Sequence, residues 1–113
     1  MSVSIKGYKV NAVTLAAAKG LTKGDLVKIS ENNTAAACAS GNVPCGLCLG
    51  TDGDYACVQL EGYMKVKYTG TAPALGNAVI AADGNGGIKT ASTGKSVLVV
   101  SVDTAAATAE IIF

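Results

Sequence analysis

Four cysteines, at positions 38, 45, 48 and 57, are the residues of this chain whose type and spacing could carry chemistry. Cys45 and Cys48 have the two-residue gap of a zinc knuckle, and Cys38 and Cys57 could complete a four-thiolate tetrahedron. A zinc knuckle places its cysteine pair on a turn, whereas Cys48 falls within a predicted strand. The spacing therefore leaves a metal site open only as an alternative.

A disulfide is the second alternative for the same thiols. If Asp52-Gly53 forms a two-residue turn, the antiparallel register places Cys48 directly opposite Cys57, at a non-hydrogen-bonded position. Thiols in a cytoplasm stay reduced, however, and a free cysteine packs as a small hydrophobic side chain. We therefore expect four buried free thiols, with the Cys48–Cys57 disulfide and the metal site as alternatives.

The other residue types used in catalysis are absent or lie in turns. The chain has no histidine, so it can form neither a Ser-His-Asp triad nor a Cys-His dyad nor a histidine metal site. Asp52, Asp54 and Asp83 lie in predicted turns, where an aspartate accepts hydrogen bonds from backbone amides more often than it acts as a general acid or base. We therefore expect no catalytic residue, no cofactor and no enzyme activity.

Two loops contain parts of ligand-binding motifs without completing them. The run DGNG at residues 83–86 is similar to the start of a calcium loop, but Gly87 and Gly94 stand where an EF-hand needs oxygen ligands. The run TGKS at residues 93–96 ends like a phosphate loop, but Lys89 replaces the first glycine and a strand follows instead of a helix. Neither loop predicts a bound ion or nucleotide.

The charge distribution argues against nucleic acid as a partner. Nine lysines and eight acidic residues give a net charge of +1, whereas a nucleic-acid-binding domain concentrates basic charge on one face. Lys65 and Lys67 alternate with apolar neighbours, so we expect them on the solvent face of a strand, with a phosphate-binding stripe as the alternative.

A membrane is not an expected partner either. No stretch approaches the roughly 18 consecutive apolar residues of a membrane helix. Residues 1–7 also lack the apolar core of a secretory signal. We expect a protein that is made in the cytoplasm and does not contact a membrane.

Turn signals divide the chain into short strands that position these residues. Gly24-Asp25 and Gly76-Asn77 each place a turn directly before a β-rich run, and Asp52-Gly53 between apolar runs is a strong hairpin signal. Residues 15–20 could form one helical turn, but the end of a strand is favoured. The predicted strands cover residues 8–20, 26–30, 34–39, 45–50, 55–60, 63–69, 78–82, 88–91, 96–102 and 106–113.

These strands predict the fold class. Turn signals every 8 to 12 residues are typical of a sandwich or barrel, and 113 residues fit one domain. We expect an all-β fold, a single compact β-sandwich or barrel of about nine or ten short, mostly antiparallel strands with little or no helix. Residues 8–113 would form this domain and residues 1–7 an N-terminal arm or edge strand. The apolar run 96–102 should be a central strand, and the segments 45–50, 55–60 and 63–69 should be three consecutive antiparallel strands.

Several segments, in this order, resemble the small capsid decoration, or cement, proteins of tailed bacteriophages. They are LTKGDLV at residues 21–27, VPCGL at 43–47, GDYACVQLEG at 53–62, VKY at 66–68 and GNAV at 76–79. The resemblance extends over about residues 8 to 113. Members typically carry a Gly-Val-Ala-like strand before the central hairpin, where this chain has Gly46-Leu47-Cys48. The cysteines and the alanine-rich segment 35–39 depart from the pattern.

The resemblance implies a non-enzymatic structural protein of the virion. Such a protein binds the outer surface of the shell formed by the phage major capsid protein, bridges neighbouring subunits and resists the pressure of packaged DNA. Similar proteins often form trimers, which implies a homo-oligomer on the capsid exterior after synthesis in the host cytoplasm. Many copies, each with a modest interface, stabilise such a shell collectively.

The N-terminal segment is a candidate contact with a neighbour. Residues 2–7 alternate polar and apolar types, so they could add as an edge strand to another chain, which makes Val3, Ile5 and Tyr8 candidate interface residues. A frayed terminus or the first strand of the domain itself is the alternative.

Two other functions stay open. A small β-domain of a phage tail or baseplate would have the same composition. A carbohydrate-binding surface module would need exposed aromatic side chains, for which the candidates are Tyr8, Tyr55, Tyr63, Tyr68 and Phe113.

Overall fold

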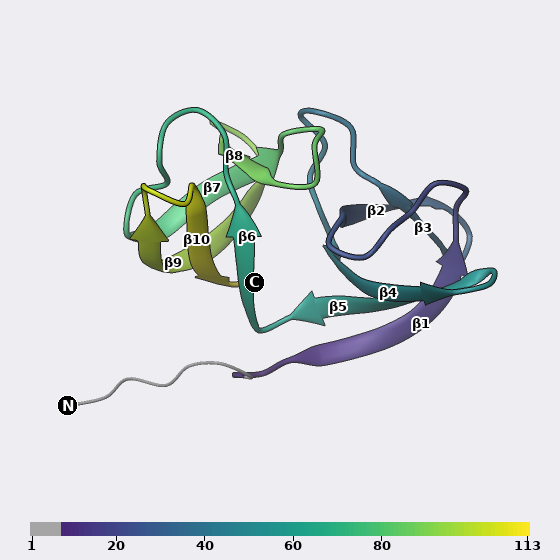
Figure 1. The fold of residues 1–113 in the computed structure, drawn as a ribbon. Coiled ribbons are helices and arrows are strands. Elements are labelled where there is room, and N and C mark those ends of the chain that lie inside the picture. Colours follow the sequence, from purple (N-terminus) through teal and green to yellow (C-terminus); the bar gives the residue numbers. More distant parts are fainter. Residues whose placement is uncertain (1–7) are drawn as a thin grey trace.

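Ten β-strands form the regular structure of residues 8–113, the part of the chain that the computed structural model describes (Figure 1). They are β1 (Asn11–Ala17), β2 (Leu26–Glu31), β3 (Thr34–Ala37), β4 (Gly46–Asp52), β5 (Tyr55–Glu61), β6 (Tyr63–Lys67), β7 (Gly76–Ala82), β8 (Ile88–Thr90), β9 (Lys95–Asp103) and β10 (Thr108–Ile112). The predicted all-β class is confirmed, and β1 extends through Ala17 as a strand. Within the described residues, no helix is long and apolar enough to cross a membrane.

The strands form two units of five. The first unit, β1–β5, is a closed barrel of order β1-β3-β2-β4-β5, and the second, β6–β10, is a sheet of order β6-β10-β9-β7-β8. The central position predicted for residues 96–102 is confirmed, because β9 lies in the middle of the second sheet. A parallel bridge between Tyr68 and Ile88 also brings the end of β6 to β8, and the Thr69 N–H donates to the Ile88 carbonyl at 3.0 Å.

The two units have the same topology. In each unit the first strand pairs antiparallel with the fifth, and the fourth strand lies between the second and the fifth. The first strand pairs in parallel with the third in the barrel, whereas in the second unit this contact is the single bridge from Tyr68, directly after β6, to Ile88 of β8. One β-bulge also corresponds, since Leu49 is the extra residue of β4 against β5 and Val100 is the extra residue of β9 against β10. The register shifts of β1 against β5 and of β2 against β3 have no counterpart in the second unit. The chain therefore contains one five-stranded arrangement twice.

The two glycine turns singled out in the sequence occupy the same place in both units. Gly24, with φ of 93°, precedes β2, and Gly76, with φ of 90°, opens β7. An L-residue rarely adopts this conformation, whereas glycine adopts it readily. In the first turn, a carboxylate oxygen of Asp25 accepts hydrogen bonds from the N–H and the hydroxyl of Thr22, both at 3.1 Å. Both predicted turns are confirmed.

The prediction of three consecutive antiparallel strands is wrong at its third strand. β4 pairs with β5, but β6 leaves the barrel and pairs with β10. The chain changes direction at Gly62, where φ is 98°. Beyond it, the Tyr63 N–H donates to the Tyr8 carbonyl at 2.8 Å, and Gln59 Nε2 donates to the Tyr63 carbonyl at 2.7 Å. These bonds occupy the N–H and C=O groups of Tyr63, which would pair with β5 if the hairpin continued into a third strand.

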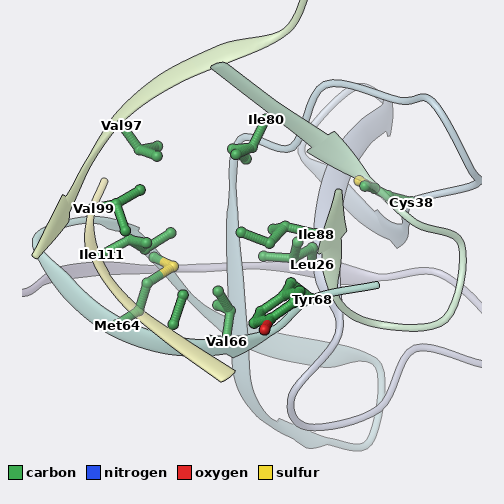
Figure 2. Close-up of a cluster of buried hydrophobic side chains, with 12 residues drawn as sticks. Leu26, Cys38, Met64, Val66, Tyr68, Ile80, Ile88, Val97, Val99 and Ile111 are labelled. Carbon is green, nitrogen blue, oxygen red and sulfur yellow. The ribbon is translucent and has the colours of Figure 1, made fainter. Parts of the chain in front are cut away.

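Two clusters of buried side chains form the core. The barrel cluster consists of Leu21, Val27, Ala35, Cys48, Ala56 and Val58. The shared cluster consists of Leu26, Cys38, Met64, Val66, Tyr68, Ile80, Ala82, Ile88, Val97, Val99, Ala109 and Ile111. Because side chains alternate along a strand, the neighbours Val27 and Leu26 of β2 enter different clusters. Figure 2 shows Leu26 within the same cluster as Ile88 and Tyr68 of the second unit. β2 therefore packs on both of its faces and joins the two units.

Candidate functional site

The four cysteines are distributed over different parts of the structure. Cys38 is buried in the shared cluster, Cys48 is buried in the barrel cluster, Cys45 packs partly buried against that barrel cluster, and Cys57 is exposed. No group of three or more His, Cys, Asp or Glu residues within 8–113 is placed to hold a metal ion. The expected burial of the thiols is therefore wrong for Cys57. The described residues also do not bring the four cysteines together as the alternative of a metal site requires.

The predicted register that makes Cys48 face Cys57 is wrong. The turn of the β4–β5 hairpin consists of residues 53 and 54, one residue later than predicted, and the bulge at Leu49 shifts the register again. Cys48 therefore stands opposite Val58, while Cys57 stands opposite Gly50. Because Cys48 is buried in the barrel and Cys57 is exposed, the thiols lie on opposite faces of the sheet, and this arrangement does not support the disulfide.

We expect Cys57 to be the one fast-reacting thiol of the folded protein. Burial, with a smaller contribution from Cys45, raises the pKa of Cys38 from 9.0 to about 11, and burial also raises the pKa of Cys45 and of Cys48. A thiol reacts as the thiolate, so these three should react slowly at pH 8. Titration with a disulfide reagent should show one fast and three slow thiols. Cys57→Ser should remove the fast phase and Cys38→Ser should leave it, whereas two or more fast thiols would contradict this assignment.

The carboxylates in the turns act mainly on backbone amides. Asp83 Oδ1 accepts hydrogen bonds from the N–H groups of Asn85 at 2.7 Å and Gly87 at 3.0 Å, which confirms the structural role predicted for Asp83. The sequence reasoning missed Asp103, whose Oδ1 accepts from two following amides in the β9–β10 turn. No corresponding hydrogen bond of Asp52 or Asp54 is found in the described part of the chain, so their predicted role stays a prediction.

An apolar row crosses the outer face of the second sheet. Tyr63 of β6 stands opposite Ile112 of β10, and Ile112 stands opposite Leu98 of β9. Leu98 is 40% exposed and stands opposite the polar Asn77 of β7, where the row ends. Leu75, two residues before Asn77 and directly before β7, is 70% exposed. Tyr63 and Ile112 are partly buried. We call these four residues the apolar face. The sequence reasoning missed it because it assigned residues 96–102 to a central strand without distinguishing the two faces of that strand.

A polar pair borders this row. The Tyr63 hydroxyl donates a hydrogen bond to the Glu110 carboxylate, and Glu110 stands opposite Lys65 in the β6–β10 register. Burial and the adjacent Glu110 raise the pKa of Tyr63 to about 12. The phenol therefore stays neutral and keeps its proton for Glu110 at physiological pH.

Of the three candidate interface residues near the N-terminus, the structure describes Tyr8. Val3 and Ile5 lie outside the described residues. Tyr8 is 49% exposed, and its carbonyl is the acceptor of the Tyr63 N–H described above. Val10 and Leu60 are also exposed at the end of the barrel where β1 begins beside β5. Tyr8 is therefore placed where it could contact a neighbour.

A crevice lies between the two units. It has a volume of about 320 Å³ and is lined by Lys23, Gly24, Asp25 and Leu47 of the first unit and by Lys65, Val66, Lys67, Asn85 and Gly86 of the second. A hollow of about 210 Å³ adjoins it and shares Asp25, Asn85 and Gly86. Lys65 and Lys67 are exposed while Met64 and Val66 are buried, which confirms their predicted place on the solvent face of a strand.

The comparisons with protein-family models and with curated proteins gave no match. The apolar face, the crevice and the resemblance in the sequence therefore carry the functional inference.

Proposed function

We propose that this protein is a decoration, or cement, protein that binds the outer surface of a tailed-phage capsid shell and stabilises it. The sequence resemblance gives the class of partner, the phage major capsid protein. The apolar face is the observation that carries the proposal, because a sheet face that meets only water is polar in most small β-proteins. No nucleophile–base pair is evident in the described residues, and the chain has no histidine, which supports a non-enzymatic role.

The apolar face fits a modest interface repeated many times. Leu75 and Leu98 expose apolar surface that a partner would remove from water at about 25 cal/mol per Å². One such contact is weak, but copies arranged as a homo-oligomer, with a trimer favoured by the resemblance, bind a regular shell with high avidity. The protein would lie on the capsid exterior after synthesis in the host cytoplasm, and neither nucleic acid nor membrane takes part.

The proposal is tested with heads of the phage that carries the gene, stripped of this protein. Wild-type protein should co-sediment with the heads and raise the temperature at which they release DNA. Leu75→Glu combined with Leu98→Glu should weaken binding at least about tenfold, because both charges would be desolvated against the shell. Both side chains are exposed, so the free energy of unfolding should change by only about 0.5 kcal/mol per substitution.

Ile29→Glu is the matched control, because Ile29 is 52% exposed on β2 of the other unit. It should bind heads like the wild type. Wild-type protein that fails to co-sediment would overturn the proposed function. Undiminished binding by the Leu75/Leu98 double variant would overturn the role of the apolar face. Binding to tails or baseplates instead of heads would identify the alternative of a tail or baseplate domain.

The structure gives the carbohydrate-binding alternative little support. Tyr68 is buried in the shared cluster, and Tyr63 is partly buried and bonded to Glu110. Tyr8 and Tyr55 are exposed, but Tyr55 stands opposite Ala16 at the far end of the β1–β5 ladder from Tyr8. The exposed tyrosines therefore do not form one stacking platform.

A further inference from the structure

We propose that the crevice between the two units binds a short, extended, acidic peptide segment of a partner protein. This site is separate from the apolar face, and β6 contributes to both. The identification of the partner as a capsid subunit rests on the proposed function, whereas the binding of an acidic peptide does not.

The first argument is the direction of the backbone groups of β6. Gly62 and Phe113 exchange both backbone hydrogen bonds, at 2.9 and 3.3 Å, so Gly62 points toward β10. Tyr63, the next residue, points the other way, because its N–H bonds to Tyr8 and its carbonyl to Gln59. Backbone groups alternate between the two edges of a strand. The residues 63, 65 and 67 therefore present their N–H and C=O groups away from β10.

Lys65 is the open position on this edge. Tyr63 is satisfied by Tyr8 and Gln59, but within residues 8–113 no backbone partner of Lys65 lies on the side away from β10. Lys65 lines the crevice at this point. An unpaired N–H and C=O on a strand edge are a template for another strand. An extended peptide supplies both the acceptor and the donor that Lys65 needs, whereas an inorganic anion supplies acceptors alone.

The second argument is charge. Lys23, Lys65 and Lys67 line the crevice, against Asp25 as the acidic lining residue, so the lining has a net charge of +2. The Asp25 carboxylate is already bonded to Thr22. Outside the crevice, Glu110 stands opposite Lys65 and holds the Tyr63 hydroxyl. The excess positive charge therefore favours a segment that carries carboxylates.

The duplicated topology shows that the lysines are not a requirement of the fold. By register, β1 has Thr14 and Ala16 at the positions where β6 has Lys65 and Lys67. The same strand arrangement therefore forms without charge at these places. The lysines belong to the first strand that lines the crevice between the two units, which is the arrangement expected of a binding site.

The shape of the crevice suits an extended chain. The partly buried Leu47 provides apolar surface, while lysines stand on both walls. Alternate side chains of a strand point to opposite sides, so a segment with alternating acidic and apolar residues could place carboxylates near the lysines and apolar groups on this surface. The volume of about 320 Å³ lies at the lower end of the usual range for ligand sites, about 300–1,000 Å³, which limits the bound portion to a few residues.

The probe is a capped hexapeptide of alternating valine and glutamate, titrated into ¹⁵N-labelled protein. We expect it to shift the amide signals of Gly24, Lys65 and Gly86. The same peptide with glutamine for glutamate should bind about tenfold more weakly, because its charge is lost. A backbone N-methylated glutamate peptide should also bind more weakly, because it cannot pair with the strand edge. Inorganic phosphate should leave the Lys65 amide unshifted.

The double variant Lys65→Gln with Lys67→Gln should bind the glutamate peptide about tenfold more weakly than the wild type. Lys19→Gln with Lys89→Gln also removes two positive charges, from lysines outside the crevice, and should leave peptide binding unchanged. Equal binding of the methylated and unmethylated peptides would overturn the strand-edge geometry. Shifts reproduced by phosphate, or no binding at millimolar peptide, would overturn the site.

Head co-sedimentation separates this inference from the proposed function. If the wild type fails to bind heads while the peptide titration succeeds, the capsid role is wrong and the peptide site stands. If the wild type binds heads but the peptide fails, the peptide site is wrong and the capsid role stands.

Discussion

Replacing Gly62 with alanine should lower the free energy of unfolding by about 2–6 kcal/mol. Two costs add at this position. The φ of +98° is a conformation that alanine rarely adopts, and an added Cβ would overlap the backbone of Tyr8 and Lys9. That backbone cannot move aside freely, because the Tyr8 carbonyl accepts the Tyr63 N–H. Equilibrium unfolding in urea, followed by circular dichroism, measures the change.

Gly53→Ala is the matched control for this prediction. Gly53 also has positive φ, at 61°, but no atom lies within 4 Å of its added Cβ. Its substitution should therefore cost only the conformational preference, about 1 kcal/mol. If the two variants were equally stable, the close approach of the Tyr8 and Lys9 backbone to Gly62 would not exist in solution.

Gly62 matters because it connects the fold to both proposed binding surfaces. At this residue the chain leaves the barrel, and β6 starts the second sheet with Tyr63 on the apolar face. The same change of direction carries Lys65 to the crevice, where the edge of β6 away from β10 gives Lys65 no backbone partner among residues 8–113. A chain that continued the β4–β5 hairpin would have paired this edge of β6 with β5, and no acceptor edge would remain.

Most strands could be predicted from the sequence, because their signals are local. The turn before β2 depends on Gly24 and Asp25, and the turn before β7 depends on Gly76 and Asn77, all within a few residues of the strand that follows. The pairing of strands could not be predicted in the same way. Whether β6 joins β5 or β10 depends on Tyr8 and Gln59, which approach it only in the folded chain.

The cysteine register shows how a small local difference changes a site. A turn one residue later and a single bulge at Leu49 are enough to place Cys48 opposite Val58 instead of Cys57. Side chains alternate with a period of two, so an odd shift moves a residue to the other face. Bulges have no strong signal in a single sequence. The residue pattern alone therefore could not establish which residue stands opposite Cys48.

The apolar face has a signal in the sequence that could have been used. The run 96–102 is almost continuously apolar, which is also the pattern of a strand buried on both faces. In the structure Val97 and Val99 are buried, but Leu98 between them is 40% exposed. In the proposed function a partner covers Leu98, and periodicity alone cannot separate such a covering partner from a second layer of the same chain.

The second large expected effect is at the junction of the two clusters. Leu26→Ala should lower the free energy of unfolding by about 2–5 kcal/mol, since Leu26 is 1% exposed and the shared cluster would keep a cavity. Leu26 is the most deeply buried residue that the first unit contributes to a cluster built mostly from β6–β10, and Cys38 and the partly buried Leu47 are the others. If the two units unfold together, the substitution should reduce hydrogen-exchange protection in both units by about the same factor.

Leu98→Ala supplies the control, because it removes the same atoms from an exposed leucine and should change stability by about 0.5 kcal/mol or less. Val27→Ala, next to Leu26 but within the barrel cluster, tests the direction of the coupling. It acts on the barrel first, so a loss of protection in β6–β10 would show that destabilising the barrel also destabilises the second sheet. A loss of protection confined to β1–β5 in the Leu26 variant would mean that the units unfold separately, and β2 would then not join them energetically.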